Sequence, residues 1–279
     1  MATENNSQSM LDLLSPERRK ALINIFGDKY AKQFMGPIAF IDGGKLSSPT
    51  AINFFNRDFP FISRVLNYEY QYRSWVGFDQ TLLDRYSDLI TKKLASITVL
   101  LENWNNRFSK LLEQNGVKVD GAVYSNAITM SVPIISGHAR GYYMVLQALD
   151  QLNLIAGTAN LYGVINATQR AEAEFMCKKA VRAFSAALRN EVVRIYREAD
   201  RLMRDQKGEV DPSKRAAHAE QGKELNAFSS AIGPDGADGE DPSKVIDEVA
   251  AATAAASQAE GSKAPGKKAA KKAPAAQAA

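Results

Sequence analysis

Side chains that could carry covalent or metal chemistry are scarce in this sequence and far apart. Histidine occurs twice, at His138 and His218, and Cys177 is the single cysteine. A zinc site or a nucleophile–base pair needs several such groups at defined spacings, and no His/Cys spacing here suits a metal. One cysteine also excludes an intramolecular disulfide, which is typical of a cytosolic chain. We therefore expect no enzyme activity, no metal and no cofactor.

Two glycine-rich stretches have the composition of ligand loops without their spacing. DGGK at 42–45 lacks the glycine spacing of a phosphate loop, and no following Ser/Thr–helix context completes it. GPDGADGED at 233–241 does not place acidic residues at the positions of an EF-hand. Neither stretch predicts a site, so we expect no small-molecule substrate.

Basic side chains offer a different chemistry, the binding of phosphate groups. A helix is predicted over about 167–206, with Asn166 as its cap and Gln169 at the capping-box position. At 100° per residue its apolar residues fall on one side and its basic residues on the other. The apolar side holds Val181, Phe184, Leu188, Val192, Ile195, Ala199 and Leu202, and the basic side holds Lys178, Lys179, Arg182, Arg189, Arg194, Arg197, Arg201 and Arg204. Such a face is either an ordinary solvated surface or a phosphate-binding one. Nearby acidic residues offset part of its positive charge.

Residues 125–134 show the alternation of a β-strand in a sequence that is otherwise helical. A strand needs a partner for its edges. The partner is either the same strand of a second copy, antiparallel about a two-fold axis, or a segment of the same chain such as GPIAFI at 36–41. A two-stranded ribbon fits the DNA major groove, where short polar side chains meet base edges. The inner face would be Ile128, Met130, Val132 and Ile134, and the outer face Ser125, Ala127, Thr129 and Ser131.

The elements that must position these groups are mostly long helices. Ser15, Pro16 and Gly27 mark the cap, first turn and end of a short helix. Residues 34–61 predict an ordered but irregular segment, and a second short helix is possible in 61–78. A long helix over 79–114 carries apolar residues every seven positions, which fits either a core helix or an intersubunit coiled coil. Ser136 caps a helix that ends near 157.

Charge is distributed unevenly along the 279 residues. Residues 1–207 hold 26 Lys and Arg against 20 Asp and Glu, 232–260 hold one Lys and seven acidic residues, and 261–279 hold five Lys and no acid. The last segment is built from Lys, Ala and Pro and is predicted to be a disordered tail that binds phosphate backbones or aids solubility. The N-terminus has no signal-peptide pattern, and no apolar run is long enough to span a bilayer. We expect no membrane association and a cytoplasmic, nucleoid-associated protein.

The strand–helix–turn–helix order, with a polar outer strand face, resembles the ribbon-helix-helix arrangement. The stretches ITMSVPIISGHARGYYMVLQALDQL and GTANLYGVINATQRAEAEFMCKKAVRAF are similar to the AcaB-like family of transcriptional regulators, found in integrating conjugative elements and conjugative plasmids of bacteria. This diffuse resemblance covers about 28–205. It implies a dimeric DNA-binding regulator of transfer genes, with Ala127, Thr129 and Ser131 on the DNA face. A ribbon-helix-helix module usually lies near the N-terminus and has shorter helices.

Together these observations predict a mainly α protein with a ribbon-helix-helix-like unit at about 122–206. We expect a flexible N-terminus at 1–14, a helical DNA-binding and dimerisation domain at 15–207, an acidic flexible linker with a possible short helix at 208–260, and the tail at 261–279. The expected partners are double-stranded DNA and a second copy, joined through strand 125–134. The alternatives are a helical scaffold protein and a non-specific nucleoid-type protein. The predicted DNA-binding residues are Ser125, Ala127, Thr129, Ser131, Asn166, Thr168, Lys178, Lys179, Arg182, Arg189, Lys267, Lys268, Lys271 and Lys272.

Overall fold

The protein is mainly helical and carries one small antiparallel sheet. The computed structural model describes residues 10–34, 36–118, 122–205, 211–232, 244–249 and 251. Residues 244–249 are also helical. The elements in chain order are α1 (Met10–Leu13), α2 (Pro16–Phe26), α3 (Asp28–Gln33), β1 (Ala39–Leu46), α4 (Pro49–Leu66), α5 (Tyr68–Arg73), α6 (Gln80–Gln114), β2 (Ile128–Ile134), α7 (Gly137–Leu161), α8 (Ala167–Asp205) and α9 (Pro212–Ile232).

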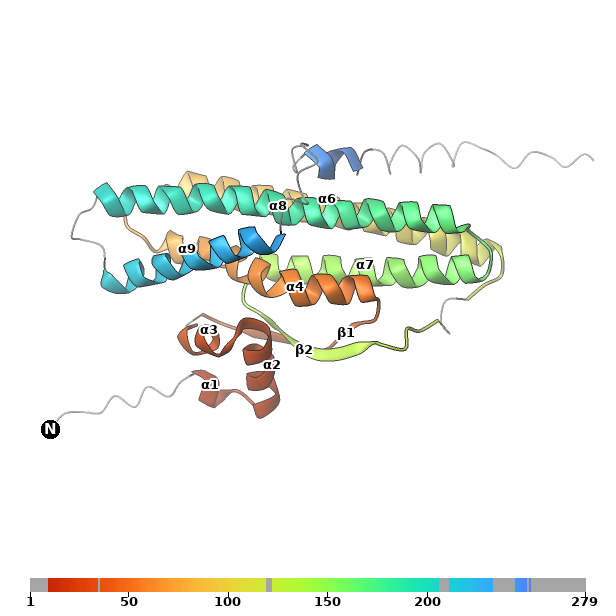
Figure 1. The fold of residues 1–279 in the computed structure, drawn as a ribbon, viewed down its shortest axis with the longest axis horizontal. Helices are drawn as coiled ribbons and strands as arrows, with labels where there is room; N and C mark the ends of the chain where they lie inside the picture. The colour runs from red at the N-terminus through yellow and green to blue at the C-terminus, as the bar shows by residue number, and fades with distance from the viewer. Residues whose placement is uncertain are drawn as a thin grey trace, which may run out of the picture.

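The long helices lie alongside one another and the sheet lies to one side of them. Figure 1 shows α6 and α8 along one side, α4 and α7 beneath them, and the β1–β2 sheet beyond α4 and α7. Helices α1, α2 and α3 gather beside the sheet, and α9 packs against α8. One large apolar core runs through the long helices, and a second small cluster holds α1, α2 and α3 against the end of β2 through Leu11, Leu22 and Phe26.

The apolar residues that recur every seven positions in α6 are buried within their own chain. Leu83, Ile90, Ile97 and Trp104 are all buried, and α6 packs against α7 and α8. The repeat therefore belongs to a core helix, which was one of the two interpretations of the pattern. The scaffold alternative needs these apolar residues at an interface with another copy, whereas they pack against α7 and α8 of the same chain.

Helix starts follow the capping signals of the sequence closely. The hydroxyl of Ser136 accepts a hydrogen bond from the Ala139 amide at 3.1 Å, which confirms the predicted start of α7. Asn166 and Gln169 form the predicted reciprocal capping pair at 2.8 and 3.0 Å. Helix α7 runs to Leu161 and not to 157, because a glycine inside a helix lowers its stability without ending it.

The segment 34–61, predicted to be irregular, contains β1 and most of α4. Ser48 caps α4, Pro49 occupies its first turn, and Pro60 lies inside it. The interior proline removes the hydrogen bond to the carbonyl of Asn56. Asn56 is exposed, so water can bind that carbonyl. Sequence reasoning treated the proline and the glycines as breaks and so missed a helix of 18 residues.

The partner of the predicted strand lies in the same chain. β1 and β2 pair antiparallel, with Ala39 opposite Ile134 and Leu46 opposite Ile128. The two-stranded ribbon is thus formed by one chain and not by two copies, and β1 overlaps the GPIAFI segment, the alternative partner. The strand also begins at Ile128 and not at 125, because Ser125 and Asn126 form a turn.

The DGGK stretch is a bulge in this sheet and not a phosphate loop. The register shifts between Ile41 and Gly44, where β1 has an extra residue. Gly43 has φ +70°, a conformation that side chains other than glycine rarely adopt. A Cβ on Gly44 would lie 2.5 Å from the Tyr143 hydroxyl. Both glycines are explained by backbone geometry.

Two segments predicted to be flexible contain folded elements. Within 208–260, α9 is a helix of 21 residues that packs against α8, and His218 on it is 2% exposed. Its composition is polar, and it packs through His218, Gln221 and Leu225 where a typical surface helix has an apolar stripe. Within 1–14, Leu11 is buried and its carbonyl accepts a hydrogen bond from Arg19 at 2.8 Å.

Candidate nucleic-acid interface

The outward face of β2 is shorter and more constrained than the alternation predicted. Thr129 is exposed on the strand, whereas Ser125 and Ala127 are exposed in the segment before it. Ser131 is partly buried, and its hydroxyl donates a hydrogen bond to Asp42 at 2.6 Å. A base edge would compete with that bond.

Asp42 places a carboxylate on the same face of the ribbon. Arg18 of α2 bonds it at 2.5 Å, and this bond, with the one from Ser131, lowers the pKa of Asp42 below its ordinary value. The carboxylate therefore stays ionised at neutral pH. Its charge is partly neutralised by Arg18. The guanidinium group of Arg18 also lies over the ring of Phe40.

Lys45 is a basic residue on the ribbon that sequence reasoning did not select. It is exposed and lies directly opposite Thr129 in the β1–β2 register. Residues directly opposite each other in a sheet share a face, so Lys45 and Thr129 point the same way. The pairing partner of a strand is not contained in its own alternation, which is why Lys45 was missed.

The start of α8 uses its side chains for capping. The side-chain oxygen of Asn166 accepts a hydrogen bond from the backbone amide of Gln169, so this side chain is occupied. Thr168 is exposed in the first turn. The first backbone amides of a helix attract anions, and residues 166–169 at the start of α8 are exposed.

The basic side of α8 divides into paired and unpaired residues. Lys178 bonds Glu174 at 3.4 Å, Arg194 bonds Glu191 at 2.9 Å, and Arg201 lies 3.6 Å from Glu198. Lys179 is partly buried. Arg182 and Arg197 are exposed and Arg189 is partly exposed, and none of these three forms an ion pair within the described residues.

The opposite side of α8 is buried as predicted, and burial extends further around its middle. Val181, Phe184, Leu188, Val192 and Ile195 are all buried. Each residue from 183 to 188 is buried, so the helix is enclosed there on every side. The arginines without ion pairs therefore lie at 182 and beyond 188, on either side of this enclosed segment.

The ribbon and the α8 face lie on opposite sides of the molecule. Figure 1 shows the sheet on one side of α4 and α7, and α8 on the other. A straight duplex lying on one of these surfaces does not reach the other. The structure thus separates two groups of residues that the sequence predicted to act together. Lys267, Lys268, Lys271 and Lys272 lie outside the described residues.

The groups that could have done other chemistry lie apart from one another. Cys177 is buried, and burial raises the pKa of its thiol to about 12. His138 lies 3.1 Å from the Thr91 hydroxyl, and His218, a buried residue of α9, lies 2.8 Å from Asp200 of α8. In the parts of the chain described by the structure, no three His, Cys, Asp or Glu side chains gather in a way that could hold a metal. No helix there is long and apolar enough to cross a membrane.

The fold is similar to that of a solved structure. No family model matches the sequence, and no curated protein matches it. The chain is similar to the crystal structure of selenomethionine-containing AcaB from uropathogenic E. coli, with a TM-score of 0.51 and 20% sequence identity. The match covers 78% of this chain and 100% of that chain. At this identity the likeness shows an AcaB-like fold.

Proposed function

We propose that the protein is a DNA-binding transcriptional regulator of a bacterial conjugative or integrative element, without enzyme activity. The observation that carries the proposal is the set of α8 arginines that form no ion pair with the described residues, on a fold similar to that of AcaB. The resemblance of the sequence to AcaB-like regulators supports the same function. The proposal places the protein in the cytoplasm, on the nucleoid.

The spacing of these arginines suits a DNA groove. Arg182, Arg189 and Arg197 are seven and eight residues apart, which corresponds to roughly 10–12 Å along the helix. The major groove is about 12 Å wide. Guanidinium groups at this spacing can contact phosphates of both strands across the groove, and each contact releases counterions.

Replacing Arg182 and Arg189 together by glutamine should weaken binding to any duplex by about tenfold or more. The slope of log K against log salt concentration should become shallower by about 2, at roughly 0.9 per phosphate contact. Fluorescence anisotropy with labelled duplexes at several salt concentrations measures both. The matched control is Arg194→Gln with Arg201→Gln, which removes the same charge from side chains already paired with acidic residues. Equal losses for both variants would exclude a specific role for the α8 arginines without ion pairs.

The ribbon is proposed as a second contact that reads sequence. Thr129→Ala should weaken binding to a fragment selected from a random DNA pool by a few-fold, because a hydroxyl contact to a base edge is lost. Binding to a random duplex should not change. A loss of the same size on both duplexes would show that Thr129 does not read bases, and no loss on either would leave α8 as the DNA surface.

A homodimer remains part of the proposal. β1 occupies one edge of β2, and among the described residues no strand pairs with the other edge. Two copies that pair through this edge would form one continuous sheet and place two ribbons side by side about a two-fold axis. Light scattering of the whole chain distinguishes the 30.5 kDa monomer from a particle of twice that mass.

A further inference from the structure

A short helix after α9 packs on the outer side of the long helices. Residues 244–249 are helical and lie beside α6 and α8, on the side away from the sheet (Figure 1). Its buried residues belong to the main apolar core, and they are Val245, Ile246 and Val249. Asp247 and Glu248 are exposed. Three apolar side chains thus hold the helix on the bundle, and its two carboxylates face outward.

An ion pair ties the same helix to α6. The ammonium of Lys93 lies 2.8 Å from the carboxylate of Asp247. The Lys93 side chain is 10% exposed, whereas that of Asp247 is 65% exposed. An ammonium held away from water needs compensation, and Asp247 supplies part of it. If the helix leaves, Lys93 becomes accessible to water and to phosphate.

This contact lies beside the middle of α8. Burial, followed by the charges of Glu69 and Glu191, raises the pKa of Tyr86 above its ordinary value, so Glu191 of α8 lies near Tyr86 of α6. The two helices pack against each other and run antiparallel (Figure 1). Lys93 follows Tyr86 by seven residues, so it lies near the α8 residue that precedes Glu191 by seven, which is Phe184.

The middle of α8 is covered on the side that carries its arginines. At about 100° per residue, Ala183 and Ala186 fall on the basic side of α8. Both are nevertheless buried, at 6% and 2% exposed. Arg182 and Arg189 lie on either side of this covered stretch. Helix 244–249, which is bonded to Lys93, therefore lies at the level of the gap between them.

The packing of helix 244–249 suits a contact that opens. Isolated helices shorter than about 12 residues are marginal in water, so a helix of this length depends on its docking. A cavity of about 410 Å³ remains beside Asp247 on the surface of α6. Arg85 and Lys92 line it, are exposed, and form no ion pair within the described residues. A weakly held element of this kind can be displaced by a ligand that binds the same surface.

We propose that helix 244–249 is an internal competitor of DNA, which covers the middle of the basic α8 face and must leave before a duplex binds there. This inference rests on the proposed DNA binding by Arg182 and Arg189 and adds its regulation. A duplex that contacts both arginines passes over the covered stretch between them. The helix belongs to segment 232–260, which holds one Lys and seven acidic residues, so docking also attaches an acidic segment to a basic surface.

Ile246→Asn tests the proposal in the full chain. The substitution removes the most buried anchor of the helix and changes no charge. A larger undocked fraction raises the apparent affinity in proportion, so we expect random and selected duplexes to bind about tenfold more tightly. Fluorescence anisotropy measures this. The matched control is Ala251→Asn, which places the same side chain at an exposed position and should leave affinity unchanged. Equal affinities of the two variants would contradict the proposal.

A second pair of variants tests the ion pair. Asp247→Asn removes one negative charge together with the bond to Lys93, and Glu248→Gln removes the same charge from an exposed position. Asp247→Asn should raise affinity by about three- to fivefold and Glu248→Gln by less, because its effect is only that of net charge. An equal gain in both would show that charge alone, and not undocking, limits DNA binding.

Hydrogen exchange of the full chain separates this inference from the proposed function. Without DNA, the amides of 245–249 should be protected in the wild type and exchange faster in Ile246→Asn. Saturating duplex should remove the protection in the wild type. If duplex binds and the protection remains, the helix is not a competitor, although DNA binding stands. If neither the wild type nor Ile246→Asn binds any duplex, the proposed function itself is wrong.

Discussion

Replacing Asp150 by alanine is expected to lower the free energy of unfolding by about 3 kcal/mol. The Asp150 carboxylate accepts the amide of Ser47 at 2.9 Å and the amide of Ser48 at 2.5 Å. Both serines are buried, at 8% and 1% exposed. Without the carboxylate, two buried amides at the start of α4 lose their acceptor. Urea unfolding followed by circular dichroism measures the loss.

The matched control for this prediction is Asp88→Ala. Asp88 is an exposed helical aspartate with no ion pair within the described residues, so its removal should change stability by less than about 0.5 kcal/mol. Asp150→Asn keeps one acceptor oxygen and should fall between wild type and Asp150→Ala. If Asp150→Ala behaves like Asp88→Ala, the contact between α7 and the β1–α4 junction does not hold these elements together.

The long helices could be predicted because their signals are local. The apolar repeat of α6 and the caps at Ser136 and Asn166 act within a few residues, and the structure confirms all three. Pro60 is a local signal that gave a wrong prediction: the helix continues through it, because the carbonyl that loses its partner belongs to the exposed residue Asn56. Elements whose start and buried face depend on residues close in sequence, such as these helices, can therefore be predicted from the sequence.

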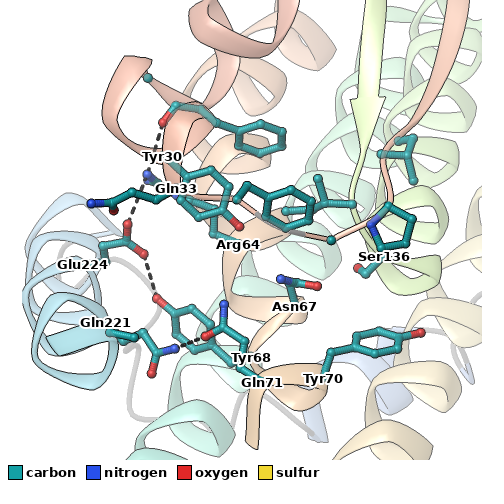
Figure 2. A pocket seen from close by; sticks show the side chains of 18 of the residues that line it. Tyr30, Gln33, Arg64, Asn67, Tyr68, Tyr70, Gln71, Ser136, Gln221 and Glu224 are labelled. Atoms are coloured by element: carbon teal, nitrogen blue, oxygen red, sulfur yellow. Dashed lines mark hydrogen bonds and ion pairs between the residues drawn. The ribbon is translucent and has the colours of Figure 1, made fainter. Parts of the chain in front are cut away.

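The remaining features depend on contacts between distant segments. The alternation of apolar and polar residues predicted β2. Its pairing with β1 and the position of Lys45 opposite Thr129 follow from the three-dimensional arrangement. The same holds for a cavity of about 870 Å³ (Figure 2), whose walls come from α2 and α3, the α4–α5 junction, the start of α7 and α9. Helix α9 was missed because its buried surface includes a histidine and a glutamine, which usually indicate a solvated segment.

His218 holds α9 against the rest of the protein, and its loss should be costly. Its Nε2 lies 2.8 Å from Asp200, its Nδ1 lies 2.9 Å from the Tyr72 hydroxyl, and its ring stacks on Tyr196 at 4.0 Å. The Tyr72 oxygen also lies 2.5 Å from Oε1 of Gln221. His218→Ala removes a buried ring and two hydrogen bonds, so we expect a loss of about 3 kcal/mol in the free energy of unfolding. Urea unfolding measures it, with loss of α9 protection in hydrogen exchange as a second readout.

The same histidine should make stability fall in weak acid. Burial lowers the pKa of His218 below its ordinary value of 6.5, an effect that Asp200 only partly opposes. The unfolded chain therefore binds a proton more readily than the folded one, and stability decreases as the pH falls below about 6.5 and through the folded pKa. Burial also lowers the pKa of His138, so His218→Gln and His138→Gln should each remove part of this dependence when unfolding is compared at pH 7.5 and 5.5. An unchanged pH dependence in His218→Gln would mean that protonation of His218 is not coupled to the docking of α9.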